Sequence, residues 1–321
     1  MLIALLIGLV VLIISTDQFV SGASTVARDM SVSPILVGAV ILGCGTGLPE
    51  LALAFYGSHE SPWRQVLQLQ GEGGEGWGFL IFFMVLVVVL VLPILFPDRV
   101  KTHSPLILMA TIAFASLLRG SLDRYEGAAM LVGFAVGVAW IVHEDRRPDD
   151  DPFADIIEDD YASRAYIEAP VMTPIQVGLL RAMCGLLGTA IGAQLLAFSA
   201  LALLKNSSYD SEVLRNIIFV GLGSLLPHVV VALQALKQHH EGLAVGNLIG
   251  SSLFNSLVIG GLVAVIKPYQ SGGNFDVFTL GVIGTTALLS WMMLSTKSEI
   301  SRTQGIALLA AYAGLVFSTV L

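Results

Sequence analysis

The sequence predicts an all-α polytopic membrane protein of about ten transmembrane helices, arranged as two inverted five-helix repeats with broken helices at the centre. Of its 321 residues, 55% are hydrophobic and only 12% are charged, and the mean hydropathy is +0.82. This composition is typical of a membrane protein and leaves no room for a separate soluble domain. In addition, an apolar segment interrupted by Gly and Pro occurs twice, which predicts repeats that meet at an ion-transport site.

A bilayer core about 30 Å thick needs roughly 20 apolar residues for each helical span. The first apolar segment has no basic flank before it, so we expect a retained helix rather than a cleaved signal. In chain order, the predicted spans cover residues 2–22, 33–57, 77–96, 104–119, 125–143, 174–204, 213–236, 243–267, 275–295 and 304–321.

The polar stretch between the fifth and sixth spans predicts the division of the chain. Ten of the 24 acidic residues lie from Glu144 to Glu168, so we expect a first repeat at 1–143, an acidic linker at 144–173 and a second repeat at 174–321. Loops on the linker side carry nine Lys or Arg residues against six on the other side. The positive-inside rule then predicts a cytoplasmic linker and an outside N-terminus in the cell membrane.

The two interrupted segments are GCGTGLPE, which ends at Glu50, and GLGSLLPH, which ends at His228. Aligning them places Thr46 opposite Ser224 and Glu50 opposite His228. Gly and Pro free backbone carbonyls that a regular helix would occupy, and these must be satisfied by ions, water or neighbouring helices. Carbonyl, hydroxyl and carboxylate oxygens are hard ligands, which favour sodium or calcium over soft metals.

Burying Glu50 near the bilayer centre would cost about 3 kcal/mol on insertion scales, so a role in the site is the main interpretation. A structural carboxyl group, protonated or hydrogen-bonded, remains the alternative for Glu50. For His228, a histidine packed at a helix end is the corresponding alternative.

These segments resemble the cation/calcium exchanger family. The match rests on GASTVARDMSVSPILVGAVILGCGTGLPELALAF in the first half, and on GLGSLLPHVVVAL and AVGNLIGSSLFNSLVIGG in the second. The resemblance implies a secondary cation antiporter that works by alternating access as one helix pair slides past the remaining bundle. It also implies sodium or calcium as the transported substrate, no cofactor and no nucleic-acid partner; it does not predict the oligomeric state.

Carried over residue by residue, the family's ion ligands fall on Thr46 and Glu50 in the first half and on Ser224 and Asn247 in the second. Glu50, Thr46 and Asn247 are the expected metal ligands. Three further polar residues are expected to pack the helices or support the ligands: Ser251, Ser252 and Asn255.

The chain departs from the family pattern in three ways. Gly47 and Leu225 replace the usual serine of the two interrupted segments. His228 replaces the second glutamate, and its imidazole, with an unperturbed pKa of about 6.5, predicts competition between protons and the cation. The first half also lacks the Gly-Asn stretch. Aligning Gly71 with Gly246 instead places Glu72 opposite Asn247, which would restore a second carboxylate unless this Gly-rich stretch is an extramembrane loop.

These departures leave an alternative function open, a diverged family member that no longer transports and acts as a membrane interaction or sensing protein. A membrane-embedded enzyme has little support, because His103, His143, His239 and His240 lie at loop edges, without paired nucleophiles or metal-ligand spacing.

Overall fold

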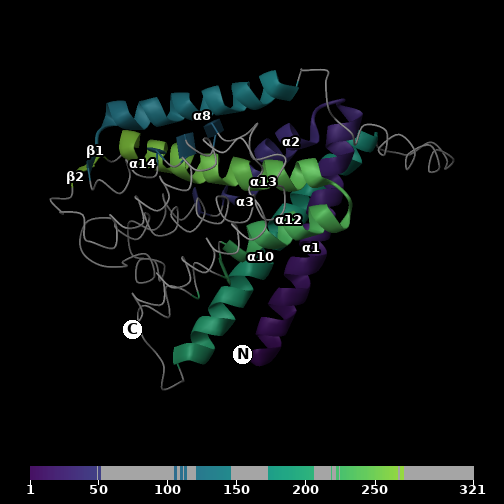
Figure 1. The fold of residues 1–321 in the computed structure, drawn as a ribbon. Helices are drawn as coiled ribbons and strands as arrows, with labels where there is room; N and C mark the ends of the chain where they lie inside the picture. The colour runs from purple at the N-terminus through teal and green to yellow at the C-terminus, as the bar shows by residue number, and fades with distance from the viewer. Residues whose placement is uncertain are drawn as a thin grey trace, which may run out of the picture.

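The described part of the chain is helical apart from one short strand pair, which confirms the all-α polytopic fold (Figure 1). The computed structural model describes residues 1–48, 50–51, 105–106, 109–110, 112–113, 121–145, 173–205, 218, 222–223, 225–266 and 268–270. The elements are α1 (Leu2–Asp29), α2 (Pro34–Val37), the π-helix η1 (Gly38–Gly43), α3 (Cys44–Thr46), β1 (Ser121–Leu122), α8 (Arg124–Asp145), α10 (Pro174–Lys205), α12 (Leu226–Lys237), α13 (Glu241–Leu253), the π-helix η3 (Phe254–Ile259), α14 (Gly260–Ile266) and β2 (Tyr269–Gln270).

Four helices within the described residues are long and apolar enough to cross a membrane: Leu2–Asp29, Arg124–His143, Pro174–Lys205 and Glu241–Ile266. They coincide with four predicted spans, although the first continues about two turns beyond its predicted end. The predicted spans at 77–96, 275–295 and 304–321, and most of the linker, lie outside the described residues. The count of ten therefore stays a prediction.

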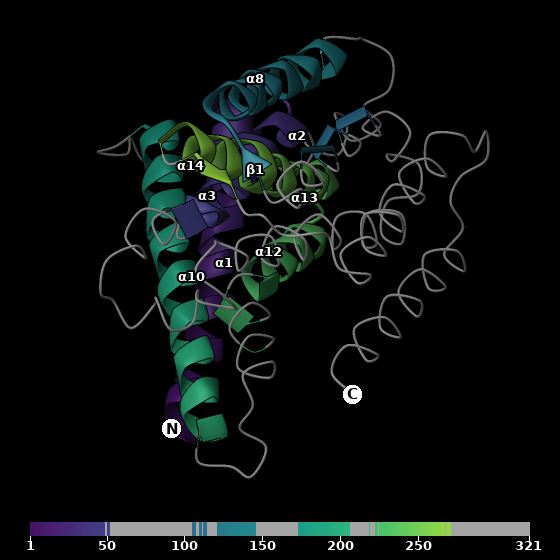
Figure 2. The same cartoon turned by 90° about the vertical axis from the view of Figure 1, so that its left-hand side faces the viewer.

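The two longest helices, α1 and α10, lie side by side and run in opposite directions (Figures 1 and 2). Gly22 of α1 faces Ala182 near the start of α10, whereas Leu12 faces Gly192 further along it. A Cβ atom on Gly22 would lie 2.4 Å from the backbone nitrogen of Ala182, so the helices touch backbone to backbone, as small residues allow in membranes. Their opposite direction is what an inverted repeat predicts for its first helices.

Local sequence explains where two of these long helices begin. The Asp123 carboxylate accepts a hydrogen bond from the backbone N–H of Glu126 at 2.7 Å, and the Glu126 carboxylate accepts one from the N–H of Asp123 at 3.0 Å. Thr173 and Gln176 make the same reciprocal pair before α10, at 3.4 and 3.0 Å. Both are capping boxes, which satisfy backbone donors that a helix start leaves without partners.

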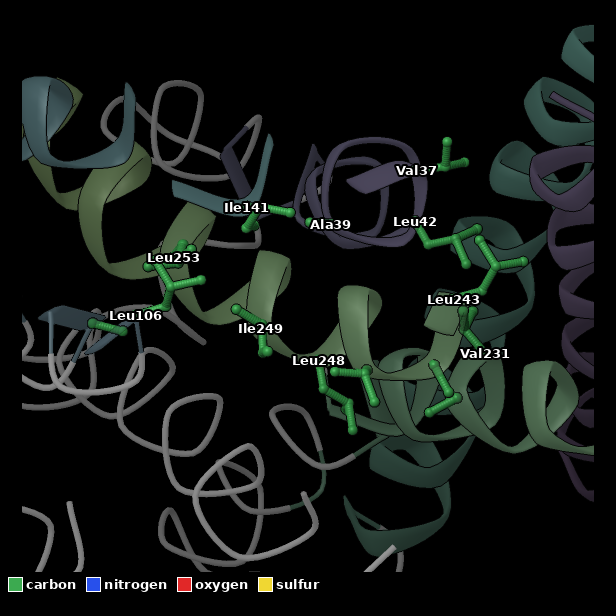
Figure 3. Close-up of a cluster of buried hydrophobic side chains, with 14 of the residues drawn as sticks. Val37, Ala39, Leu42, Leu106, Ile141, Val231, Leu243, Leu248, Ile249 and Leu253 are labelled. Carbon is green, nitrogen blue, oxygen red and sulfur yellow. The ribbon is translucent and has the colours of Figure 1, made fainter. Parts of the chain in front are cut away.

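The helix formed by α2, η1 and α3 packs closely against α13. A Cβ atom on Gly38 would lie 2.5 Å from the carbonyl oxygen of Leu243, and one on Gly43 would lie 2.6 Å from the backbone nitrogen of Ser251. Around this contact, buried side chains of the two helices and of α12 form the core shown in Figure 3, where Leu42 and Val231 both lie near Leu243. The core therefore joins elements from both halves of the chain.

The outer surface of α1 is apolar and its inner face carries polar groups. Ile3 is 73% exposed and Ile14 is 60% exposed, whereas Thr16 is fully buried and donates its hydroxyl to the Leu12 carbonyl at 2.9 Å. Large exposed apolar side chains along a helix, with polar ones inside, indicate a helix that faces lipid.

The strand pair is a feature that the sequence analysis did not predict. Ser121 pairs with Gln270 and Leu122 with Tyr269 in an antiparallel ladder, which joins the start of α8 to the end of α14. Beside it, Gly127 of α8 approaches Gly261 so closely that a Cβ atom would lie 2.7 Å from the Gly261 carbonyl oxygen. The ladder extends the contact between α8 and α14 that Figures 1 and 2 show.

Candidate functional site

The first half of the site is built on the interrupted helix of α2, η1 and α3. The Ser33 hydroxyl caps its start by accepting a hydrogen bond from the backbone N–H of Ile35 at 3.1 Å, and Pro34 follows as the first helical residue. Six residues then have π-helical backbone, and α3 ends at Thr46. π-helical turns are rare and occur frequently at functional sites.

Thr46 and His228 bring the two halves into direct contact. The Thr46 hydroxyl oxygen lies 2.8 Å from Nδ1 of the His228 imidazole, although the residues are 182 positions apart. Thr46 is 4% exposed and His228 is 1% exposed. The two interrupted segments identified in the sequence therefore meet inside the protein.

The hydrogen bonds of Thr46 assign the tautomer of His228. The Thr46 oxygen also lies 2.7 Å from the carbonyl oxygen of Leu42 and 3.1 Å from that of Gly43. A hydroxyl has one proton to donate, and a carbonyl can only accept. Since the Thr46 proton is directed to these carbonyls, the His228 imidazole donates Nδ1–H to the Thr46 oxygen. The hydrogen-bond network thus assigns the neutral Nδ1–H tautomer, which has its lone pair on Nε2.

Asn247 adds a third element to the same cluster. It lies on α13, is fully buried, and donates its amide N–H to the backbone carbonyl of His228 at 3.0 Å. This bond orients the Asn247 amide so that its nitrogen faces α12 and its carbonyl oxygen points elsewhere. Helices α3, α12 and α13 are therefore connected by one chain of hydrogen bonds.

Glu50 follows Thr46 by one helical turn. A backbone hydrogen bond of 3.0 Å from the Leu51 N–H to the Gly47 carbonyl shows a helical turn at this point of the chain. The Glu50 side chain is only 6% exposed. The Glu50 carboxyl group is thus buried four residues along the chain from Thr46, and its role as an ion ligand stays a prediction.

The break in the first helix lets Asn255 of η3 come close. A Cβ atom on Gly47 would lie 2.5 Å from Cδ1 of Phe254 and 3.2 Å from the amide oxygen of Asn255. Gly47 stands where the family pattern has serine, and the absence of a side chain there is what admits Phe254 and Asn255.

Several buried polar atoms in this cluster have no hydrogen-bond partner within the described residues. They are Nε2 of His228, the amide oxygen of Asn247 and both amide atoms of Asn255. Buried polar atoms are nearly always paired, so such a concentration singles out this cluster as the candidate binding site. Across the described ranges, no three His, Cys, Asp or Glu side chains gather closely enough to hold a metal. A cation here must therefore also use amide, hydroxyl or backbone ligands.

Of the six predicted ion-binding residues, the structure brings four into this region: Thr46, Glu50, His228 and Asn247. The other two, Ser224 and Glu72, lie outside the described residues. Ser251, Ser252 and Asn255, expected as supporting groups, are all buried.

Sequence reasoning missed a set of polar contacts between α1 and α12. The Gln238 amide donates to the Asp17 carboxylate at 3.0 Å and to the Asp17 backbone carbonyl at 3.3 Å, and the Ser21 hydroxyl donates to the Gln238 amide oxygen at 3.3 Å. One turn earlier, the Gln234 amide donates to the Ile13 carbonyl at 3.2 Å. Two glutamines four residues apart near the end of an apolar helix were the available signal.

Comparison with known proteins agrees with this architecture. The family model described as sodium/calcium exchanger protein matches residues 1–62 and 177–321. The putative antiporter CaxA of Alkalimonas amylolytica is 30% identical over 98% of both chains. The sodium/calcium exchanger MaX1 of Methanosarcina acetivorans is 23% identical over 96% of this chain and 95% of that protein.

A solved structure of the sodium/calcium exchanger from Methanococcus jannaschii has the same fold. It matches with a TM-score of 0.68 and 22% identity, and the match covers 98% of this chain and 96% of that one. Because the family model matches more than half of the chain, and a relative 30% identical aligns along nearly all of it, this protein belongs to the sodium/calcium exchanger family.

Proposed function

We propose that this chain is a secondary cation antiporter that works by alternating access at one central site built from its two halves. The observation that carries the proposal is the buried chain of hydrogen bonds from Thr46 through His228 to Asn247. The relatives named antiporter and sodium/calcium exchanger align over nearly the whole chain, which supports the same kind of transport here.

In this proposal, Glu50 is the principal ligand of the transported cation and supplies its carboxylate charge. Thr46 and Asn247 contribute oxygen atoms, and Ser224 and Glu72 complete the set as the repeat alignment predicts. The substrate is an inorganic cation, for which sodium and calcium are the first candidates because oxygen ligands suit both. Transport is proton-sensitive, because a proton added to His228 would place a positive charge beside the cation.

The moving part in this proposal is the pair of helices α1 and α10. They touch backbone to backbone along glycines, which supports their moving as one unit. Within the described residues, α1 makes polar contacts with Gln234 and Gln238 at the end of α12. An interface between such a pair and the bundle can change by sliding, with few side chains to repack.

The arrangement in the membrane is part of the same proposal. Two repeats, 1–143 and 174–321, are inverted relative to each other and joined by the acidic linker 144–173. The linker lies in the cytoplasm and the N-terminus outside, in the cell membrane. The antiparallel course of α1 and α10 supports the inversion.

The alternative of a diverged, non-transporting member is not favoured. A site released from selection would lose its buried polar groups, which are costly in a membrane. Here Glu50, His228, Asn247 and Asn255 are all at most 6% exposed.

Uptake into proteoliposomes tests the proposal. Purified protein is reconstituted, loaded with sodium or with protons inside, and supplied with radioactive Ca²⁺ or Mn²⁺ outside. We expect gradient-driven uptake that Glu50→Gln abolishes. The matched control is Glu126→Gln, at the start of α8, where a glutamine can still accept the capping hydrogen bond. Uptake that Glu50→Gln leaves unchanged would refute the shared-site mechanism.

A further inference from the structure

His228 stands where the repeat alignment calls for a second carboxylate, and the structure leaves one of its two ring nitrogens without a hydrogen-bond partner among the described residues. Its Nδ1 is used by Thr46, at 2.8 Å. Its Nε2, on the far side of the ring, is buried and has no hydrogen-bond partner among the described residues. A buried ring nitrogen without a partner is unusual and calls for a physical explanation, such as a bound ion.

The tautomer decides which kind of ligand Nε2 can take. Because Thr46 directs its proton to the carbonyls of Leu42 and Gly43, the ring carries its proton on Nδ1. The Nε2 atom therefore presents a lone pair, which accepts a proton or coordinates a metal ion. Metal-binding histidines in proteins show this arrangement, in which the other ring N–H donates to an oxygen that fixes the orientation of the imidazole.

In this inference, the other buried polar groups of the cluster supply the remaining ligands. Glu50 supplies a buried carboxylate one turn from Thr46, and the Asn247 amide oxygen and the Asn255 amide are buried without partners in the described structure. The set therefore combines one nitrogen, one carboxylate and neutral amide oxygens. It contains one formal negative charge from the described residues.

We propose that His228 is a cation ligand through Nε2, and that it makes this site select divalent first-row transition ions, such as Mn²⁺, Co²⁺ or Zn²⁺, over Ca²⁺. This inference rests on the proposed antiporter function and names the substrate class of the same site. Ca²⁺ takes six to eight oxygen ligands, and an imidazole nitrogen replaces one of them poorly. Imidazole suits the first-row transition ions, and Mn²⁺ also accepts carboxylate and carbonyl oxygens.

Besides the oxygen that the proposed function assigns to it as a ligand, Thr46 has a second role in this scheme, because it positions the His228 ring. Its oxygen holds the ring by accepting from Nδ1–H, and its own proton is held by the preceding turn of helix. Loss of such a supporting contact typically weakens metal binding 10- to 100-fold. We expect Thr46→Val to weaken Mn²⁺ binding by that factor, with rescue by Thr46→Ser.

The first experiment asks whether nitrogen binds the metal. Protein purified without a polyhistidine tag and grown with ¹⁵N-histidine is loaded with one equivalent of Mn²⁺ and examined by pulsed electron paramagnetic resonance. We expect a ¹⁵N coupling that His228→Gln removes. His143→Gln and His239→Gln, at two exposed histidines, are the matched controls and should retain it.

The second experiment measures selectivity. Initial uptake of Mn²⁺ and Ca²⁺ is compared in proteoliposomes for the wild type, for His228→Glu, which restores the carboxylate of the family pattern, and for His143→Gln. We expect the wild type to prefer Mn²⁺, and the Mn²⁺-to-Ca²⁺ ratio to fall at least about tenfold in His228→Glu, since a lost ligand should matter no less than a lost supporting contact.

The outcomes separate this inference from the proposed function. The protein could take up Ca²⁺ in exchange for sodium or protons and yet show no nitrogen coupling to Mn²⁺, or a Mn²⁺-to-Ca²⁺ uptake ratio that His228→Glu leaves unchanged. Either result would overturn the inference and leave the antiporter intact. Nitrogen-coupled Mn²⁺ that depends on His228, without uptake of any cation, would support the ligand assignment and refute the antiporter. Absence of both would overturn both.

Discussion

Gly246 provides the sharpest structural test of how the site is held together. It precedes Asn247 on α13 and faces the interrupted helix. A Cβ atom at this position would lie 2.1 Å from the carbonyl oxygen of Ile35, 2.8 Å from the backbone nitrogen of Ala39 and 2.9 Å from Cα of Gly38. All three are backbone atoms, so rotating a side chain cannot relieve the clash, and Gly246→Ala must separate the two helices.

The size of the effect follows from these distances. Ordinary contact for a Cβ atom begins near 3.4 Å, so the 2.1 Å contact must lengthen by about 1.3 Å. Asn247 ties α13 to α12 through the His228 carbonyl, so a shift of that size between the interrupted helix and these two helices would lengthen the 2.8 Å contact between Thr46 and His228 past hydrogen-bonding range. Overpacking of this kind typically costs about 1–3 kcal/mol, which corresponds to a fall of roughly 2–8 °C in apparent melting temperature.

The assay compares Gly246→Ala with Gly133→Ala. Gly133 lies on α8, where a Cβ atom would meet Leu257 at 3.5 Å and Met109 at 3.8 Å, both ordinary contacts. Melting of the detergent-purified proteins should fall by several degrees for Gly246→Ala and stay within about 1 °C for Gly133→Ala, because ordinary contacts need no rearrangement. Cation uptake should fall in Gly246→Ala and stay at the wild-type level in Gly133→Ala.

The reasoning would be refuted if Gly246→Ala melted and transported like the wild type. The backbone contact between α13 and the interrupted helix would then not hold the site in place. If Gly133→Ala were equally damaging, helix glycines in general, rather than close approach, would explain the loss.

Three further predictions follow from individual hydrogen bonds. Thr46→Val leaves the His228 Nδ1–H buried without its acceptor, so we expect a loss of about 1–3 kcal/mol in melting experiments, with Thr46→Ser close to wild type. Gln238→Leu removes the contacts to Asp17, and hydrogen exchange at the backbone of α1 should increase while exchange in α8 stays unchanged. Asp123→Ala removes the cap of α8 and should lower stability by about 0.5–2 kcal/mol, with uptake per folded molecule unaffected. A fall in uptake per folded molecule would contradict a purely structural role for this cap.

Much of the fold could be predicted from the sequence because the bilayer imposes a simple rule on apolar segments. The starts of α8 and α10 agree with the predicted spans, and their capping boxes are readable as short motifs. The interrupted segments around Thr46 and His228 could also be recognised, because Gly and Pro inside an apolar run are conspicuous.

The geometry of the site could not be predicted in the same way. Nothing local to His228 indicates that Thr46 would accept from its Nδ1, because that contact depends on the packing of two helices 182 residues apart. The contact between Gln238 and Asp17 was missed for the same reason. The strand pair was missed because two-residue strands have no periodicity to detect.

The most direct test of the account is isothermal titration calorimetry of purified protein with Mn²⁺ and Ca²⁺, using one variant from each half. Glu50→Gln alters the first half, and Asn247→Leu alters the second with a side chain of similar size. If the halves share one site, the wild type shows one saturable binding event and each variant loses it. Thermal melting without cation should show that both variants are still folded. Wild-type binding retained in either variant would contradict a single site built from both halves.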